Sequence, residues 1–306
     1  MPFLSIIIPM YNREREIVRA LASCTIQLYD DFEVIVVDDA STDQSAAVVS
    51  AFADPRLRLL RQPENRGPCP TRNAGIAQAR GAWILLLDSD DELLPGALAR
   101  IAAHAQQAPP EIGRLVFLYR YSTGGYSPDP VLKDGEWDYR GYLRWAEQAK
   151  TRGDFSNCIR RETFQNVPLP DSCAFESGYH LDFAARYRTR TVPEAVALVH
   201  LDAGNRASVP DARRLLDDAA EWAGTVDRLL RDHGDALRCD APGLYRNFLK
   251  VAALQHLLAG HRRAGAALAR QYLRQHPTAP DGWVILTAGL LHPHLLAWAK
   301  TFKERH

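Results

Sequence analysis

The chain has 306 residues, of which 46% are hydrophobic and 24% charged, and its formal net charge at pH 7 is zero. These values are ordinary for a globular protein that buries a core. A neutral chain lacks the positive field that draws proteins to nucleic acid, so the composition argues against a nucleic-acid partner.

The cysteine content bears on the cellular compartment. Five cysteines are present, an odd number, and none of them form a C-x-x-C pair. This usage predicts neither a disulfide framework nor a structural zinc site, and it favours a reducing cytoplasm. The apolar run at the N-terminus is too short for the core of a signal peptide, and no apolar stretch is as long as a transmembrane helix.

Apolar strands alternate with helices over the first 119 residues. We expect strands at 3–8, 32–37, 57–60, 83–87 and 115–119, and helices at 13–29, 43–53, 71–80 and 95–106. Such alternation is typical of an α/β fold with a mostly parallel sheet flanked by helices.

The remainder of the chain changes character twice. Residues 124–135 are rich in Gly, Pro and Asp and indicate a surface loop, and residues 139–200 lack a regular pattern apart from a strand at 196–200. Four helical stretches follow, at 212–233, 242–258, 263–275 and 282–302. We therefore expect an α/β domain over 1–209, with halves 1–110 and 111–209, and a helical C-terminal region over 210–306.

Polar residues follow three of the expected strands. Ligands of open α/β sheets bind at the carboxyl ends of strands, so these residues are expected to converge on one edge. They are residues 9–12 after the first strand, 38–43 after the second and 88–91 after the fourth.

Asp88 and Asp90 are candidates for binding a metal ion. The chain has no glycine-rich loop for phosphate, and carboxylates repel phosphate. Two carboxylates can instead hold Mn²⁺ or Mg²⁺, which then bridges phosphate oxygens. The alternative is that residues 88–91 only cap the following helix, since Asp is favoured there.

Four segments in this order resemble the family 2 glycosyltransferases: SIIIPMYN, VIVVDDASTD, NRGPCPTRNAGIAQARG and ILLLDSDDELLPGAL. The resemblance covers about the first third of the chain. It implies a GT-A fold and transfer of a sugar from a nucleotide-diphosphate donor, with residues 1–110 binding the nucleotide sugar and 111–209 forming the acceptor half.

The resemblance also implies roles for residues of the nucleotide pocket. Pro9, Tyr11 and Asn12 match the motif that lines the nucleoside pocket, although Tyr11 is equally interpretable as a core aromatic. Asp39 matches the acid that accepts a hydrogen bond from the uracil imide N–H. Arg72 matches an arginine near the base and the diphosphate, the alternative being a surface helix residue.

The DXD motif of the family matches Asp88, Ser89 and Asp90. The resemblance places Asp88 near the ribose and the metal, Ser89 in the nucleotide site, and Asp90 on the metal as a direct ligand. Some relatives carry a third metal ligand where His200 ends the strand at 196–200. A buried histidine with a structural partner is an equal alternative for His200.

The catalytic base is less well defined by the resemblance. Many relatives carry Glu-Asp before a helix, whereas residues 174–182 read AFESGYHLD here. Glu176 is the leading candidate for the base after a shift of about one residue, and Asp182 is the second. An exposed helix acid is the favoured alternative for Asp182.

The predicted function is a metal-dependent inverting glycosyltransferase that uses a UDP-sugar, with a dTDP-sugar as the second choice. The partners expected are a glycan or glycolipid acceptor in surface polysaccharide or lipopolysaccharide synthesis of the bacterial cell envelope. A nucleotidyltransferase and an inactive nucleotide-sugar-binding module are the alternatives. The basic C-terminal helices suggest peripheral contact with the inner face of the membrane, and plain packing on the catalytic domain is the favoured alternative.

Overall fold

The computed structural model describes residues 1–128, 133–149, 155–171, 176–201 and 216–291. The chain divides into two compact units. The first comprises Met1–Tyr142, Ala149–Cys173 and Asp182–Gly204, and the second comprises Leu143–Gln148, Ala174–Leu181 and Asn205–His306. The second unit therefore includes two short segments that lie before the boundary expected at residue 209.

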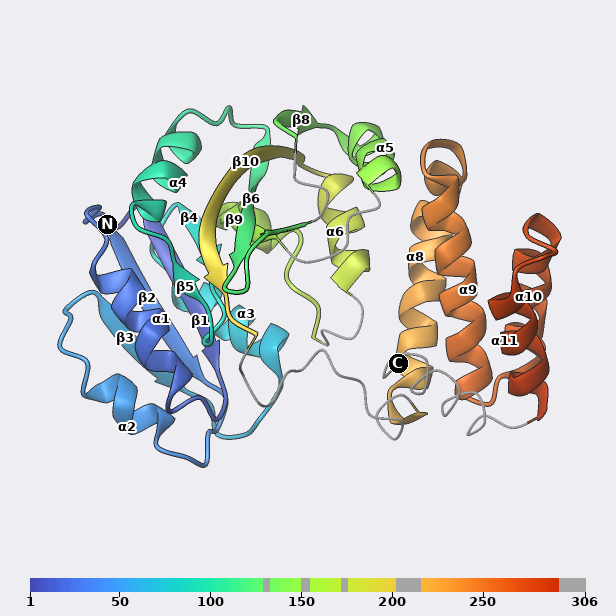
Figure 1. Ribbon diagram of the computed structural model, residues 1–306, viewed down its shortest axis with the longest axis horizontal. Helices are drawn as coiled ribbons and strands as arrows, with labels where there is room; N and C mark the ends of the chain where they lie inside the picture. The colour runs from blue at the N-terminus through green and yellow to red at the C-terminus, as the bar shows by residue number, and fades with distance from the viewer. Residues whose placement is uncertain (129–132, 150–154, 172–175, 202–215, 292–306) are drawn as a thin grey trace. The chain divides into compact units, whose positions relative to one another are not determined.

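One mixed sheet runs through the first unit (Figure 1). Its main order is β3-β2-β1-β4-β9-β6-β10-β5, with β7 paired to β6 and β8 paired to β10. The strands are β1 (Leu4–Met10), β2 (Phe32–Asp38), β3 (Leu57–Arg61), β4 (Trp83–Leu86), β5 (Glu92–Leu93), β6 (Ile112–Tyr121), β7 (Tyr126–Ser127), β8 (Gly135–Trp137), β9 (Ser156–Arg160) and β10 (Arg188–Val199).

The N-terminal half of the sheet is parallel. Strand β1 pairs in parallel with β2 and β4, and β2 pairs in parallel with β3. Every residue of β1 and β2 is buried, as continuous apolar runs predict for central strands. Strand β9 is antiparallel to both β4 and β6, so the sheet becomes mixed beyond β4.

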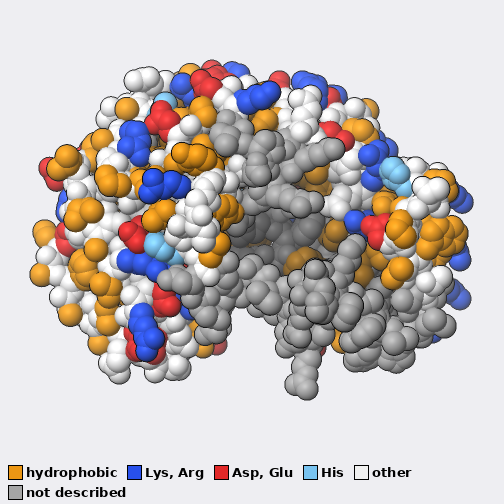
Figure 2. All heavy atoms as spheres, viewed as in Figure 1, with side chains coloured by type: hydrophobic (Ala, Val, Ile, Leu, Met, Phe, Trp, Pro, Cys, Tyr) orange, Lys and Arg blue, Asp and Glu red, His pale blue; other side chains and the backbone are white. Residues whose placement is uncertain are grey.

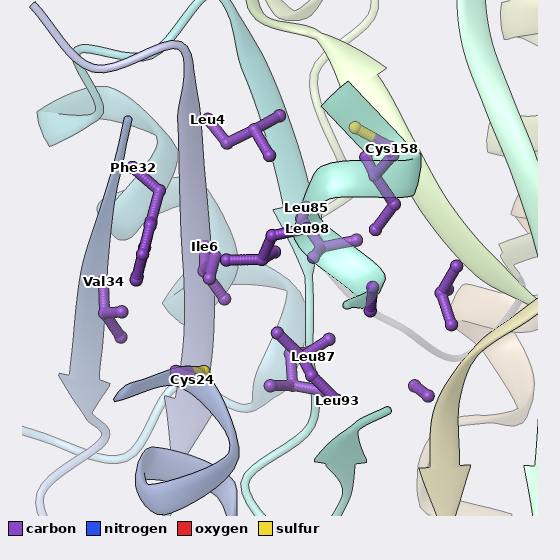
Figure 3. Packing of buried hydrophobic residues seen from close by; sticks show 14 of the residues in the cluster. Leu4, Ile6, Cys24, Phe32, Val34, Leu85, Leu87, Leu93, Leu98 and Cys158 are labelled. Atoms are coloured by element: carbon purple, nitrogen blue, oxygen red, sulfur yellow. The ribbon is translucent and has the colours of Figure 1, made fainter. Parts of the chain in front are cut away.

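Helices cover both faces of this sheet. Alternate side chains of β1, such as Leu4 and Ile6, join Phe32 of β2 and residues of α1 (Glu16–Thr25) and α4 (Ala97–Gln106) in one core (Figure 3). On the other face, α3 (Pro68–Gln78) approaches β1 so closely that a Cβ at Gly75 would lie 2.7 Å from Ile7. The three layers confirm the α/β fold class expected from the sequence.

Further helices are found in the described part of the chain. They are α2 (Ser45–Ser50), α5 (Tyr139–Ala149), a 3₁₀ helix (Arg161–Gln165), α6 (Glu176–Ala184), α8 (Ala219–Asp240), α9 (Pro242–Leu258), α10 (Arg262–Gln275) and α11 (Pro280–Leu291). The first of them, α2, packs on β2 and β3.

Helices α8 to α11 form the main body of the second unit. Helix α9 packs against α8, α10 and α11, and its Ala253 and Leu257 share a separate core with Ile285 of α11. The carboxylate of Glu147, on α5, accepts hydrogen bonds from the backbone N–H groups of Gly243 and Leu244 at 2.8 and 2.9 Å. This side chain caps the N-terminus of α9 and explains why residues 143–148 belong to the helical unit.

The structure departs from the sequence expectations in two respects. Apart from a strand at 196–200, no regular element was expected in the segment 139–200, yet it contains α5, β9 and α6, and its last strand, β10, already begins at Arg188. Cys69 is disulfide-bonded, whereas the cysteine usage predicted no disulfide framework. Pairing of cysteines depends on their distance in space, which spacing along an odd set does not reveal. The free cysteines among the described residues are Cys24, Cys158 and Cys239.

No helix in the described part of the chain combines the length and the apolar character that crossing a bilayer requires.

Candidate functional site

The segments that follow β1 and β2 are tied together by hydrogen bonds at the carboxyl ends of these strands. The backbone N–H of Asp39 donates to the carbonyl of Met10 at 2.8 Å. The backbone N–H of Asn12 donates to Oγ of Ser41 at 2.9 Å, and that of Thr42 donates to Oδ1 of Asn12 at 2.8 Å. These reciprocal bonds hold Asn12 at φ 50°, a left-handed conformation that is unfavourable for most residues with a side chain.

Pro9 and Tyr11 differ in what they offer to a ligand. Pro9 is buried within β1 and pairs with Val37 of β2, so it contributes to the sheet. Tyr11 follows the strand, and 43% of its surface is exposed. The interpretation of Tyr11 as a core aromatic is therefore wrong, and its ring is available for contact with a ligand.

Asp39 is a buried carboxylate at the end of β2, with 3% of its surface exposed. Its Oδ1 accepts hydrogen bonds from Nε2 of Gln62 at 3.0 Å and from the backbone N–H of Arg66 at 2.9 Å. Its Oδ2 accepts from the backbone N–H of Gly67 at 2.8 Å. The carboxylate thus anchors the turn between β3 and α3, and its role toward a nucleobase stays a prediction.

Arginines surround the acidic segment that follows β4. Nη2 of Arg72, on α3, donates to Oδ1 of Asp88 at 2.7 Å. Nε of Arg13 lies 3.9 Å from Oδ2 of Asp90, and Nε of Arg19 donates to the carbonyl of Asp90 at 2.9 Å. Arg72 is therefore largely buried and paired with Asp88, and its role near the base and the diphosphate stays a prediction.

The pKa values of two acids in this segment are raised. Burial, followed by repulsion from Asp88, raises the pKa of Asp90. Burial, followed by repulsion from Asp88 and Asp90, raises the pKa of Asp91 to about 8. Ser89 lies between these acids and is also buried. The arginines therefore do not offset the burial and mutual repulsion of these carboxylates, and a helix cap alone does not require such an acidic cluster.

His200 follows β10 and contacts Asp91 and the adjoining Glu92. Its backbone N–H donates to Oδ1 of Asp91 at 3.2 Å, and its Nε2 lies 2.7 Å from Oε1 of Glu92. Glu92 is on β5, which pairs antiparallel with β10. The role of His200 as a metal ligand stays a prediction.

The residues present fit a divalent cation that is held partly by protein carboxylates and partly by the phosphate oxygens of a bound nucleotide. Carboxylate oxygens suit Mn²⁺ and Mg²⁺. Burial and, second to it, repulsion between the acids raise the pKa values of Asp90 and Asp91, and a cation would relieve that repulsion. Within the described ranges, no group of three or more His, Cys, Asp or Glu side chains is arranged to hold an ion. Asp88 and Asp90 would thus share the ion with phosphate oxygens and water.

The two candidates for the catalytic base lie on one helix. Glu176 is the first residue of α6, and Asp182 lies in its last turn, half-buried. The side chain of Glu176 lies outside the described residues. Both assignments stay predictions.

Three polar residues at the site were not singled out from the sequence: Gln62, Arg13 and Glu92. Gln62 directly follows β3, so the rule applied to the ends of the other strands would have found it. Arg13 lies next to the first motif, in the turn before α1. The position of Glu92 depends on the pairing of β5 with β10, for which the sequence carries no signal.

Comparison with known proteins relates this site to a family. The model of "Glycosyl transferase family 2" matches residues 5–167, which is more than half of the 306-residue chain. The succinoglycan biosynthesis protein ExoO of Rhizobium meliloti is 45% identical over 111 residues, covering 36% of this chain and 32% of that protein. A GalNAc(5)-diNAcBac-PP-undecaprenol beta-1,3-glucosyltransferase of Campylobacter jejuni is 31% identical over 171 residues, covering 54% of each chain. The match thus spans about a third to a half of these relatives.

Solved structures resemble the whole chain in fold. Residues 1–349 of S. aureus TarS in complex with UDP-GlcNAc match with a TM-score of 0.61 and 18% identity, covering 100% of this chain and 93% of that one. The mannosyltransferase PcManGT from Pyrobaculum calidifontis, in complex with GDP-Man and Mn²⁺, matches with a TM-score of 0.54 and 22% identity, covering 100% and 88%. These likenesses support the GT-A fold expected from the sequence.

Proposed function

The chain belongs to glycosyl transferase family 2, and we propose that it transfers a sugar from a nucleotide-diphosphate donor to an acceptor hydroxyl. One observation carries the proposal. Asp39 directly follows β2, and the acidic segment Asp88–Asp91 follows β4, at the same edge of the parallel half-sheet. Asp39 offers a hydrogen-bond acceptor to a nucleobase, and the acidic segment offers carboxylates to a cation that binds diphosphate.

We favour a uridine nucleotide, with thymidine as the alternative. Uracil and thymine both present an imide N–H, which a buried carboxylate such as Asp39 can accept. Adenine lacks this donor and presents an acceptor at the corresponding position. The chemistry of the base therefore predicts selection for a UDP-sugar or a dTDP-sugar.

We assign Mn²⁺ or Mg²⁺ to Asp88 and Asp90, with His200 as a further candidate ligand. When bound, the ion stabilises the charge that develops on the departing diphosphate. Arg72 and Arg13 contact the same acids and supply positive charge at the edge of the site. The support for this assignment is the donor chemistry of the acids and the repulsion among them.

We propose that transfer proceeds with inversion. The acceptor oxygen forms a bond to the anomeric carbon as the bond from that carbon to the diphosphate oxygen breaks. A carboxylate accepts the proton of the acceptor hydroxyl, which contributes about 10²–10⁴ in rate. Glu176 is the leading candidate for this base and Asp182 the second.

The acceptor is proposed to be a glycan or a glycolipid. One relative is named for succinoglycan biosynthesis, and another for a glucosyltransferase acting on an undecaprenol-linked glycan. An acceptor of the second kind is anchored in a membrane, which would place the chain in the cytoplasm at the inner face of that membrane. In this arrangement residues 1–110 bind the donor, residues 111–209 bind the acceptor, and residues 210–306 form the helical region.

Helix α10 supports peripheral contact with an anionic membrane. Residues 241–280 contain six Lys and Arg and no Asp or Glu. Arg263, Arg270 and Arg274 are exposed and share one side of α10, because they are seven and four residues apart. Trp283 and Val284 of the adjoining helix α11 are about half exposed, and apolar and basic side chains both appear on this part of the surface (Figure 2). Basic and aromatic side chains together suit a lipid interface.

Calorimetry of nucleotide binding tests the central proposal. UDP should bind at least tenfold more tightly with Mn²⁺ than with chelator, and more tightly than ADP in the presence of Mn²⁺. Asp90→Asn should remove most of the effect of the metal, because it removes a charged ligand. Glu194→Gln, a half-exposed acid that pairs with Arg100 and His104, is the control. Equal UDP affinity with and without Mn²⁺ would refute the metal assignment.

An inactive nucleotide-sugar-binding module is the second candidate, because Ser177-Gly178 occupies the place where many relatives carry Glu-Asp. Membership of a glycosyltransferase family argues against the nucleotidyltransferase alternative. Incubation of a UDP-sugar with lipid-linked and soluble glycan acceptors, followed by mass spectrometry, separates transfer from binding alone. Tight, metal-dependent UDP binding without any sugar transfer or donor hydrolysis would favour the inactive module.

A further inference from the structure

Asp39 is part of a closed ring of hydrogen bonds. Nε2 of Gln62 donates to Oδ1 of Asp39 at 3.0 Å and to Oγ1 of Thr71 at 2.7 Å. The hydroxyl of Thr71 donates to the carbonyl of Gly67 at 2.7 Å, and the N–H of Gly67 returns to Oδ2 of Asp39 at 2.8 Å. Four residues from the ends of β2 and β3 and the start of α3 thus form one cycle.

The orientation of the Gln62 amide is set by its partners. A carboxylate oxygen only accepts, so the amide atom facing Asp39 must be the NH₂ group. Both hydrogens of that NH₂ group are then used, one on Asp39 and one on Thr71. The backbone N–H of Gln62 also donates to the carbonyl of Asp38 at 2.9 Å, which fixes the residue next to β2.

The ring leaves the carboxylate of Asp39 with a defined remaining capacity. A carboxylate has about four acceptor positions, two on each oxygen. Among the described residues, Gln62 and the N–H of Arg66 reach Oδ1, whereas Gly67 alone reaches Oδ2. Oδ1 is therefore saturated, and a donor from a ligand is directed to Oδ2. Without Gln62, Oδ1 would regain an open position, and only the backbone N–H groups of Arg66 and Gly67 would hold the carboxylate.

We propose that Gln62 is a positioning residue for recognition of the base, acting through Asp39. The inference rests on the proposed function, in which Asp39 accepts the imide N–H of uracil. Gln62 contributes to specificity because it fills the second position on Oδ1 and, together with the backbone N–H groups of Arg66 and Gly67, holds the carboxylate so that Oδ2 remains for the ligand. Thr71 supports this arrangement by holding the second hydrogen of the Gln62 amide.

The ratio of two affinities tests this role. N3-methyl-UDP lacks the imide N–H, so the wild-type chain should bind it at least about tenfold more weakly than UDP, as expected for a hydrogen bond to a charged group. Gln62→Met preserves the length of the side chain and removes the NH₂ group. In this variant the ratio should fall to within about threefold, with weaker UDP binding and unchanged affinity for Mn²⁺-pyrophosphate.

A pair of variants at Thr71 separates positioning from folding. Thr71→Val removes the hydroxyl at nearly constant volume, and Thr71→Ser keeps it. The valine variant should lose part of the discrimination between UDP and N3-methyl-UDP, and the serine variant should retain it. A purely structural role would lower the melting temperature of Gln62→Met or Thr71→Val and leave the ratio unchanged, which would overturn the proposal. If Gln62→Met fails to fold, the comparison of the two Thr71 variants decides. A wild-type ratio near one would refute base recognition by Asp39 itself.

Discussion

Nη2 of Arg72 and Oδ1 of Asp88 lie 2.7 Å apart, which joins α3 to the acidic segment after β4. The pair is asymmetric in exposure, because the side chain of Arg72 is 16% exposed and that of Asp88 is 47% exposed. Arg72 thus neutralises one of three neighbouring acids, while the more exposed Asp88 stays accessible to a ligand.

Replacement of Arg72 by Met should weaken donor binding without much loss of stability. A partly exposed ion pair contributes about 0–1 kcal/mol to folding, so the melting temperature should change by only a few degrees. The affinity for UDP with Mn²⁺ should fall about tenfold or more, because a cation near the diphosphate is lost. Calorimetry and thermal unfolding measure the two effects, with Arg100→Met as a matched control because Arg100 also forms a partly exposed ion pair. A large loss of stability with unchanged UDP affinity would make Arg72 a structural residue.

The acid content of the segment after β4 predicts that stability depends on pH when metal is absent. The pKa of Asp91 is raised from 3.8 to about 8 by burial and by its acidic neighbours. A pKa that is higher in the folded state stabilises the protein fully below pH 4, and this contribution is lost as the pH rises toward 8. One pKa unit corresponds to about 1.4 kcal/mol, so even part of this shift should move the melting temperature by several degrees.

The variant Asp91→Asn tests the origin of that dependence. In chelator, the wild-type melting temperature should fall from pH 5 to pH 8, and the fall should be smaller in the variant. An asparagine oxygen can still accept the backbone N–H of His200, so the local hydrogen bond is preserved. Added Mn²⁺ should flatten the wild-type curve, because a cation favours the ionised acids. Parallel curves for the two proteins would show that Asp91 does not titrate in this range.

The central features of the fold were predictable because they depend on local sequence. Continuous apolar runs specify β1, β2 and β4 as buried parallel strands, and polar residues at their ends then fall on one edge. Strand β9 was not predicted, because Ser156–Arg160 mixes polar and apolar residues and is ordered by pairing with β4 and β6. Strand propensity of this kind depends on tertiary context.

The contacts that refine the site could not be predicted, because they join residues far apart in the chain. Glu92 and His200 are separated by 108 residues, and Gln62 and Asp39 by 23. Residue type alone does not show that Asp39 also anchors the turn before α3. Motif resemblance predicts which residues belong to the site, whereas hydrogen-bond geometry shows which of their atoms already have partners within the protein.

Truncation before Pro277 should leave donor binding intact and destabilise the helical unit. The residues proposed to bind the nucleotide all lie in the first unit, whereas α11 contributes Ile285 to the separate core of the second. A Cβ at Gly282 would lie 2.8 Å from Tyr272, which shows how closely α11 packs on α10. The Kd for UDP should stay within about twofold, and a thermal transition should shift downward. An insoluble product would show that α11 is needed for the core of the helical unit and would favour packing over a membrane-docking role.

A full-length variant tests membrane contact without disturbing that core. Replacing Arg263, Arg270 and Arg274 by Gln should reduce binding to vesicles that contain phosphatidylglycerol at least tenfold, since each basic residue contributes about 1 kcal/mol near an anionic surface. Binding to neutral phosphatidylcholine vesicles and the affinity for UDP should not change. Flotation assays at low and physiological salt measure the effect, and equal vesicle binding by both proteins would contradict the docking role.

Two conservative variants, Glu176→Gln and Asp182→Asn, distinguish the two candidates for the catalytic base. If Glu176 is the base, Glu176→Gln should leave UDP affinity and melting temperature near the wild-type values and lower the rate of sugar transfer about 10²–10⁴-fold. If it only caps α6, where it is the first residue, the same change should lower the melting temperature and leave turnover largely intact. Asp182→Asn lies on the same helix and controls for the loss of one acid. A severe loss of transfer rate in that variant alone would assign the base to Asp182.

Because both substitutions keep the side-chain volume, a change in rate without a change in stability reports on proton acceptance. Full activity in both variants would place the base elsewhere in the chain, or it would mean that transfer does not proceed by the inverting route.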